Sequence, residues 1–463
     1  MKTLFTFFAF TTLTALNAHA ASSTPPPPSA TTRLENAGGI ASGVVRTKIA
    51  GIDVIAYPTG VKDVVTLRGS LPAGDAFSAD GNVAIATLTG MLLDQGTTKQ
   101  DKFAIAEKLE SVGATLSFEV GTEMAEVNAK CLKKDMPLVI GLIAEQLRFP
   151  ALSAEEFEKA KKQFAGNLQR QLEDTGFRSS DTFSRAVYPV GHPNRSPSTE
   201  DFLAGVQAAR LEDVVAFHKK YYGSAHFTLV AVGDLDVPQI QSEIGKAFAG
   251  WTGGVALPPP AKATMTDAPR EQNVFMPEKT SVSVVIGQAT GLRYSDPDYQ
   301  ALRVATAVLG GSGFSGRLMQ TVRDEEGLSY GVYSNTSHDT FTDGDWRITA
   351  TFGPSLLDKG IASTRRQLTK WYTEGISADE LSYRKSNLIG LFKVNLATTD
   401  GLAASLLAAV HRGYGPGWLD EYPKRIDALT LDQVNSAVKK YLKPESMFII
   451  KAGTIPGATP GSN

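Results

Sequence analysis

The chain carries the same long pattern twice, and this internal repeat limits it to folds that are built from two similar halves. Residues 211–222 read LEDVVAFHKKYY, and residues 431–442 read LDQVNSAVKKYL. A leucine, an acidic residue, a valine and Lys-Lys-Tyr recur at the same offsets, and each copy is followed by an apolar run and a glycine. Residues 64–80 and 284–297 match more weakly, in the same order. A duplication with a period of about 220 residues is the simplest account.

The pattern of apolar residues within the first half predicts a sheet that is covered by helices. Residues 64–71, 114–132 and 226–233 are rich in β-branched residues, which predicts strands, with a hairpin in the middle segment. Residues 136–147 and 153–174 have the apolar spacing of amphipathic helices. This mixed order indicates the α+β class, with two similar duplicated halves and a mostly antiparallel sheet in each.

Two of the predicted helices carry a start signal. Ser153 is followed three residues later by Glu156, and Ser377 is followed in the same way by Glu380. A serine and a glutamate at this spacing form a capping box, in which each side chain accepts a hydrogen bond from a backbone N–H of the first turn. We therefore expect a helix to begin at each serine, at matching places in the two halves.

The N-terminus has the pattern of a secretory signal peptide. Lys2 precedes a mostly apolar run at residues 4–16, and Ala18-His19-Ala20 is a small-x-small cleavage site. The apolar run is shorter than the ~20 residues that a membrane span needs. Cleavage after Ala20 predicts a soluble exported protein, most simply a bacterial periplasmic one.

Proline and glycine clusters divide the rest of the chain. SSTPPPPSATT follows the cleavage site, and TGGVALPPPAKAT lies between the two halves. Neither segment can continue a helix or a central strand. The predicted segments are a signal peptide at 1–20, a proline-rich tether at 21–39, an N-terminal domain at 40–251, a linker at 252–265, a C-terminal domain at 266–455 and a flexible tail at 456–463.

Composition excludes several classes of function. The chain has 46 Lys and Arg against 48 Asp and Glu, a net charge of −2, so no basic surface indicates binding to nucleic acid. Cys131 is the single cysteine, which excludes an intrachain disulfide and a zinc site built from thiolates. Beyond the signal peptide, no segment is long and apolar enough to predict a membrane span.

Residues 309–333, LGGSGFSGRLMQTVRDEEGLSYGVY, carry the most specific motif of the chain. A glycine-rich turn runs into an amphipathic helix, and Gly327 is the predicted helix stop. Arg323 and Tyr330 then flank one helix-to-strand corner. A phosphate-binding loop needs lysine and then serine or threonine after its glycines, and the chain has arginine and leucine there. Nucleotide binding is therefore not expected.

The motif resembles the second half of the pitrilysin/insulinase class of zinc peptidases, the inverted zincins that include the mitochondrial processing peptidase. The resemblance covers about residues 40–455 and is specific at residues 309–334 and 225–236. It implies two peptidase-like halves that face each other across a chamber and that act on peptides.

The resemblance also implies roles for individual residues. Tyr330 and Arg323 would be catalytic: the phenol would donate to the scissile carbonyl oxygen, and the guanidinium would hold a neighbouring backbone carbonyl. Gly311, Gly313 and Phe314 would touch substrate at the mouth of the chamber. Each role has a structural alternative. Arg323 could form an ion pair with the glutamate three residues on, and Tyr330 could be an ordinary strand tyrosine. The glycines could simply form a tight helix-entry turn.

The first half lacks the metal motif of that family. His-x-x-Glu-His on a helix supplies two zinc ligands and a general base, and a glutamate on a later helix supplies the third ligand. Gly96-Thr97 resembles the family's loop just after this motif. Aligned on that loop, the chain has Thr87 and Met91 at the histidine positions, Gly90 at the position of the base and Asn167 near the position of the third ligand. Residues 20–191 contain no histidine. No metal site is predicted in this chain, and zinc is expected in a partner subunit instead.

The remaining histidines form no metal-binding pattern. No two of them lie four residues apart, and they are His192, His218, His226, His338 and His411. His192 lies in VYPVGHPN, which resembles the family's Tyr-x-x-x-His-Pro loop, where the histidine has a structural role.

Three functional hypotheses remain open. The first is a non-catalytic, substrate-binding subunit of a heterodimeric zinc metallopeptidase, which would supply Arg323 and Tyr330 to a related partner chain that carries the zinc motif. The second is a catalytically dead scaffold or peptide-binding protein. The third is an independent peptidase with an unrecognised site, and the lack of suitable histidines argues against it. The sequence leaves the peptide substrate open, as well as the choice between homodimer and heterodimer.

Overall fold

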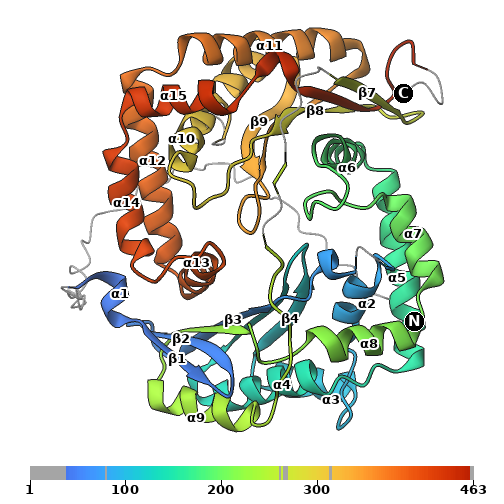
Figure 1. Ribbon diagram of the computed structural model, residues 1–463, viewed down its shortest axis with the longest axis vertical. Coiled ribbons are helices and arrows are strands. Elements are labelled where there is room, and N and C mark those ends of the chain that lie inside the picture. Colours follow the sequence, from blue (N-terminus) through green and yellow to red (C-terminus); the bar gives the residue numbers. More distant parts are fainter. Residues whose placement is uncertain (1–37, 79–80, 260–261, 264–269, 312–314, 459–463) are drawn as a thin grey trace, which may run out of the picture. The chain divides into compact units, whose positions relative to one another are not determined.

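Two sheets of the same design organise the chain (Figure 1). The computed structural model describes residues 38–78, 81–259, 262–263, 270–311 and 315–458, so the predicted signal peptide and most of the tether lie outside the described residues. The first sheet has the order β1-β2-β6-β3-β5-β4, with β1 Val45–Ile49, β2 Ile52–Pro58, β3 Val64–Leu71, β4 Thr115–Val120, β5 Ala125–Leu132 and β6 Thr228–Gly233. The second has the order β7-β11-β8-β10-β9, with β7 Arg270–Phe275, β8 Val282–Ala289, β9 Ser329–Ser337, β10 Asp345–Phe352 and β11 Phe448–Gly453.

The pairing pattern of the two sheets is the same. β2 pairs with β6, and β7 with β11, in parallel. The neighbours β6-β3-β5-β4 and β11-β8-β10-β9 are antiparallel in both sheets. The first sheet differs only by β1, which forms a hairpin with β2. This equivalence confirms the predicted α+β fold with two similar halves, and β4 and β5 form the predicted hairpin.

Helices follow the strands in both halves. The first half has α1 Gly39–Gly43, α2 Ile85–Leu92, α3 Lys102–Ser111, α4 Met136–Arg148, α5 Ala154–Leu172, α6 Thr175–Val187, α7 Thr199–Ala208, α8 Leu211–Tyr221 and α9 Val237–Ala247, with short turns η1 Asp75–Phe77 and η2 Lys133–Asp135. The second has α10 Tyr299–Leu309, the π-helix η4 Met319–Glu325, α11 Leu357–Glu374, α12 Ala378–Leu396, α13 Thr399–His411, α14 Trp418–Ala428 and α15 Leu431–Tyr441, with short turns η5 Pro354–Leu356 and η6 Pro444–Ser446. None of these described helices has the length and apolar character that crossing a membrane requires.

The two predicted capping boxes differ in the structure. Ser377 and Glu380 form the complete box at the start of α12. At α5, Ser153 accepts from the backbone N–H of Glu156, but the return bond is not made. The Glu156 carboxylate pairs instead with Lys102, at 2.7 Å. The predicted start of α5 is therefore confirmed, but only one of the two hydrogen bonds of the predicted capping box forms.

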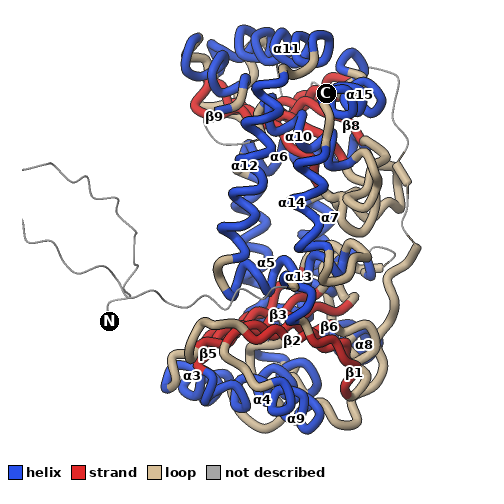
Figure 2. Tube along the Cα trace, turned by 90° about the vertical axis from the view of Figure 1, so that its left-hand side faces the viewer, coloured by secondary structure: helices blue, strands red, loops and turns tan. Residues whose placement is uncertain are grey.

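The two halves cover each other's sheets. α4 and α9 lie against one face of the first sheet, and α13 from the second half lies against the other face (Figure 2). In return, α6 from the first half packs on β8 and β11. Alternate residues of β6 separate the two faces: Leu229 and Ala231 lie in the core of the first half, whereas Val230 and Val232 join the core of the second.

Matching hydroxyl pairs mark this exchange of helices. Thr399, the first residue of α13, accepts at 2.9 Å from Thr66 of β3. Thr175, the first residue of α6, lies 2.8 Å from Ser283 of β8. Thr66 and Ser283 occupy equivalent positions, because each pairs with the residue just before the final glycine of its neighbouring strand. The two helices therefore enter the opposite halves at equivalent points.

Phe183 on α6 tests how strongly the halves depend on each other. Its side chain is fully buried against residues of β8 and β11. Phe183→Ala should lower the free energy of unfolding by about 3–5 kcal/mol, because it leaves a cavity between the halves. Urea unfolding followed by circular dichroism measures this. Phe103→Ala, at an exposed phenylalanine of α3, is the control. A loss below about 1 kcal/mol for Phe183→Ala would show that the exchange contributes little.

Candidate functional site

The fold brings together the two helices on which the family's metal ligands would lie. Thr87, Gly90 and Met91 lie on α2, and Asn167 lies on α5. α2 and α5 pack against each other. The segments named from sequence thus occupy one corner of the first half.

The residues at this corner do not fit a zinc ion. Thr87 donates its hydroxyl to Asp75 at 2.8 Å, and the Asn167 side chain is bonded to Arg170. A side chain at Gly90 would begin 2.3 Å from a methyl group of Val120, so a general base has no room there. Within the described part of the chain, no three His, Cys, Asp or Glu side chains are grouped closely enough to hold a metal.

A cavity of about 590 Å³ lies beside this corner, and we call it the inter-half cavity. Asp75, Thr87 and Phe164 line it from the first half, and His338 and Arg347 line it from the second. Burial raises the pKa of Asp75 to about 6, although the hydrogen bond from Thr87 acts in the opposite direction. The cavity therefore contains a carboxyl group that titrates near neutral pH, where a metal site would otherwise be expected.

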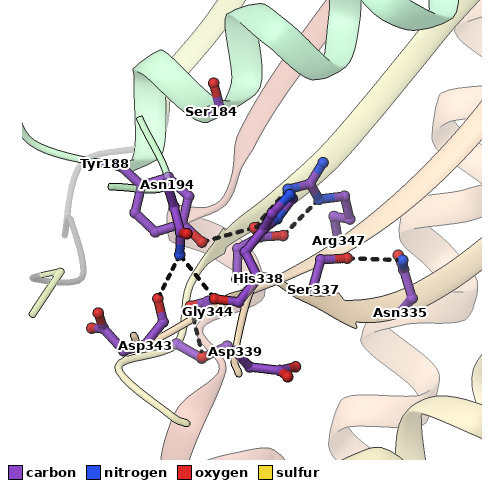
Figure 3. A network of polar contacts seen from close by, with 12 residues as sticks. Ser184, Tyr188, Asn194, Asn335, Ser337, His338, Asp339, Asp343, Gly344 and Arg347 are labelled. Carbon is purple, nitrogen blue, oxygen red and sulfur yellow. Dashed lines mark hydrogen bonds and ion pairs between the residues drawn. The ribbon is translucent and has the colours of Figure 1, made fainter. Parts of the chain in front are cut away.

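A buried polar network that includes the lining residues His338 and Arg347 joins the halves (Figure 3). Asp345 on β10 accepts two hydrogen bonds from Arg347, each 2.6 Å, and one from the Tyr188 hydroxyl at 2.8 Å. His338 Nδ1 lies 3.2 Å from the same carboxylate. Burial alone would raise the pKa of Asp345, but Arg347 and His338 outweigh it and lower the pKa to about 2. The carboxylate thus stays charged and holds Tyr188 of the first half against the second.

His192 belongs to the same junction. It is buried, and its Nε2 lies 2.9 Å from Asp343 of the second half. The backbone N–H of Asn194 donates to its Nδ1 at 3.1 Å. Because Nδ1 accepts, the ring proton lies on Nε2 and is donated to Asp343. The structural role expected for this loop agrees with these contacts.

Sequence reasoning missed this network. The signal that could have revealed it is the alternation Asp343, Asp345, Arg347, three charged residues at every second position across the start of β10. Charged residues at every second position usually indicate a solvent face, whereas these are at most 7% exposed.

Arg323 and Tyr330 lie together at the predicted corner. Arg323 is on the π-helix η4, and such helices are rare and frequently lie at functional sites. Gly327 ends the turn with a φ of +62°, a left-handed conformation that favours glycine, and β9 begins two residues later. The Arg323 guanidinium lies over the Tyr330 ring, 5.4 Å from its centre. The helix stop at Gly327 is confirmed.

The contacts argue against one of the two structural alternatives for this pair. Arg323 pairs with Asp324 at 3.2 Å, whereas Glu326, the partner expected in that alternative, pairs with Arg366. Tyr330 is the second residue of the edge strand β9 and is 85% exposed, so the alternative of an ordinary strand tyrosine stays open. Neither residue lines the described part of the inter-half cavity, so the structure does not bring this pair to the α2 corner within one cavity.

The glycine-rich turn is only partly described. Gly313 and Phe314 lie outside the described residues. At Gly311 a side chain would begin 2.9 Å from the backbone of Ala307, and the N–H of Gly311 donates to Thr306. This glycine is therefore required by the tight exit from α10, and its predicted contact with substrate stays a prediction.

The pH dependence of folding should report Asp75. Its pKa rises from 3.8 to about 6 on folding, so the folded state holds a proton that the unfolded state releases as the pH rises through this interval. Stability is therefore lost between pH 4 and 6, by about 1–3 kcal/mol. Asp75→Asn should remove this loss, and urea unfolding from pH 4 to 7 measures it. Asp94→Asn, at an exposed carboxylate after α2, is the control. Identical pH profiles for Asp75→Asn and the unmodified chain would contradict the assignment.

Comparisons with known proteins agree with this geometry. Residues 56–188 match the family model described as Insulinase (Peptidase family M16), and residues 208–388 match the model described as Peptidase M16 inactive domain. The Streptomyces coelicolor protein named uncharacterized zinc protease SCO5738 is 26% identical over 362 residues, 76% of each chain. The Helicobacter pylori protein named non-peptidase homolog YmxG is 22% identical over 376 residues, 80% of this chain and 84% of that one.

A solved structure shows the same fold. The crystal structure of a peptidase M16 inactive domain from Pseudomonas fluorescens superposes with a TM-score of 0.82 at 24% identity, over 90% of this chain and 99% of that one. The two family models together cover more than half of the sequence. The chain belongs to the M16 peptidase family, as a homologue whose first half lacks the family's metal-binding residues.

Proposed function

We propose that the chain is a non-catalytic, substrate-binding subunit of a heterodimeric zinc metallopeptidase. In this proposal a related partner chain carries the zinc motif, and this chain contributes Arg323 and Tyr330 to the partner's site for peptide hydrolysis. The observation that carries the proposal is the difference between the halves: the corner on α2 has no ligand set, whereas the Arg323–Tyr330 corner keeps both side chains together.

The chemistry of the two side chains suits this role. The Tyr330 phenol makes no hydrogen bond with a described residue, so its O–H is available to a carbonyl oxygen that gains negative charge during hydrolysis. Arg323 can hold a neighbouring backbone carbonyl through its guanidinium. Its position over the Tyr330 ring also limits the conformations of the phenol. The π-helix and Gly327 fix the distance between the two backbones.

The second candidate is a peptide-binding scaffold without catalytic use of the pair. The lost metal corner and the name of the Helicobacter pylori relative are compatible with it. A scaffold has no chemical need for an exposed phenol beside a guanidinium, and this favours the complementing subunit. Both candidates would act after export to the periplasm, as the N-terminal signal pattern suggests.

The isolated chain should bind no stoichiometric zinc. The expected ligand positions are occupied by Thr87, Met91 and Asn167, none of which is a usual zinc ligand. Inductively coupled plasma mass spectrometry after dialysis against zinc, with an extensive wash, measures the metal content. One tightly bound zinc ion per chain would contradict the proposal, because the chain would then have a metal site of its own.

The pair itself is tested in a complex with the zinc-bearing partner. Tyr330→Phe removes one donor to the transition state and should lower kcat by about 10²–10³-fold with little change in KM. Arg323→Ala should also raise KM, because a guanidinium that holds a backbone carbonyl acts in the ground state as well. A quenched peptide pool measures both constants.

Tyr333→Phe, on the same strand and also partly exposed, is the matched control. Thermal unfolding of the three variants is run in parallel. Full activity of both Tyr330→Phe and Arg323→Ala would favour the scaffold. A stability loss of several kcal/mol in both would assign them a structural role instead.

A further inference from the structure

The second half contains a cavity of its own, of about 620 Å³, which the proposed function does not use. It lies among α10, α12, α13, α14 and the end of β9. We call it the arginine cavity, because Arg303 of α10 and Arg412 after α13 both line it. Its volume is typical of sites that hold a small ligand or a few residues of a peptide.

The two guanidinium groups have few partners in the protein. Arg303 donates to the Tyr422 hydroxyl at 2.7 Å. The Arg412 guanidinium lies over the Tyr294 ring, 3.5 Å from its centre, and its Nε is buried without a hydrogen-bond partner. Among the described residues, no carboxylate lies within 4.0 Å of either group. Two half-buried guanidinium groups, which the Asp339 carboxylate compensates only in part, favour an anionic ligand between them.

The remaining lining adds one negative charge and an apolar wall. Asp339 is the carboxylate of the lining, and it is 7% exposed and accepts from Tyr299 at 2.6 Å. One carboxylate against two arginines leaves the cavity positive. Trp418, Phe392 and Leu391 supply the apolar surface, and Leu391 is 57% exposed. A ligand that fits both features carries its negative charge next to an aromatic or branched apolar group.

We propose that the arginine cavity binds a carboxylate that is attached to an apolar group, held by Arg303 and Arg412 against the Trp418 wall. A planar carboxylate suits the fork of an arginine, and Tyr294 keeps the Arg412 guanidinium in a fixed plane. The C-terminus of a peptide that ends in an apolar residue and a free arylalkyl acid share this chemistry. The site is independent of the Arg323–Tyr330 corner, so its failure would leave the proposed function intact.

Isothermal titration calorimetry with the full mature chain tests the site. The probes are N-acetyl-Ala-Ala-Phe and its C-terminal amide, and 3-phenylpropionate and its amide. At least one acid should bind, and its amide should bind at least tenfold more weakly, because the amide loses the charge-assisted bonds. The acid that binds identifies the source of the carboxylate, a peptide C-terminus or a small organic acid.

Variants locate the binding. Arg412→Gln should weaken the acid at least tenfold, and Ala404→Phe should abolish binding by filling the cavity, which Ala404 lines. Arg210→Gln, at an exposed arginine paired with Asp213, should change nothing. Circular dichroism melting checks that each variant is folded. If Arg412→Gln does not fold, the binding result for Ala404→Phe decides.

Three results would overturn the proposal. The first is that neither acid binds, and the second is that an acid and its amide bind equally well. The third is that the folded cavity variants bind the acid as tightly as the unmodified chain does.

Discussion

Each sheet of this molecule has one face that only the other half of the chain can cover. The apolar residues on that face, such as Val230 and Val232 of β6, would otherwise meet water. α13 and α6 cross between the halves to bury them. This exchange brings Tyr188 of the first half to Asp345 of the second, beside the cavity between the halves.

Local features of the structure could be predicted, because their causes lie within a few residues. The α4 and α5 segments, the β4–β5 hairpin and the helix stop at Gly327 depend on short-range periodicity and on one backbone conformation. The exchange of α6 and α13 could not be predicted in this way. α6 is amphipathic and α13 is apolar over most of its surface, and neither pattern shows which sheet the helix will meet.

The sites, too, could be predicted only where their residues lie close together in the sequence. The Arg323–Tyr330 corner could be predicted because seven residues of chain and one glycine determine it. The Asp345–Arg347 pair was missed because a buried ion pair has the same sequence pattern as a solvated one. Arg303 and Arg412 are far apart in the chain, and only the packing of α10, α13 and α14 against α12 places them in one cavity. Contacts over such separations are properties of the whole fold.

The matching hydroxyl pairs Thr66–Thr399 and Thr175–Ser283 have a consequence for the origin of the chain. A single half has no helix to cover its own sheet in this way, so an ancestor of one half's length would have traded that helix with a second, identical copy. The two halves of the present chain are thus related to each other as the two subunits of a domain-swapped homodimer would be. Because the two halves are now separate parts of one chain, their sequences can differ. The two halves of this chain therefore carry different corners, one at α2 without a metal-ligand set and one with Arg323 over Tyr330, while the contacts that join the halves stay matched.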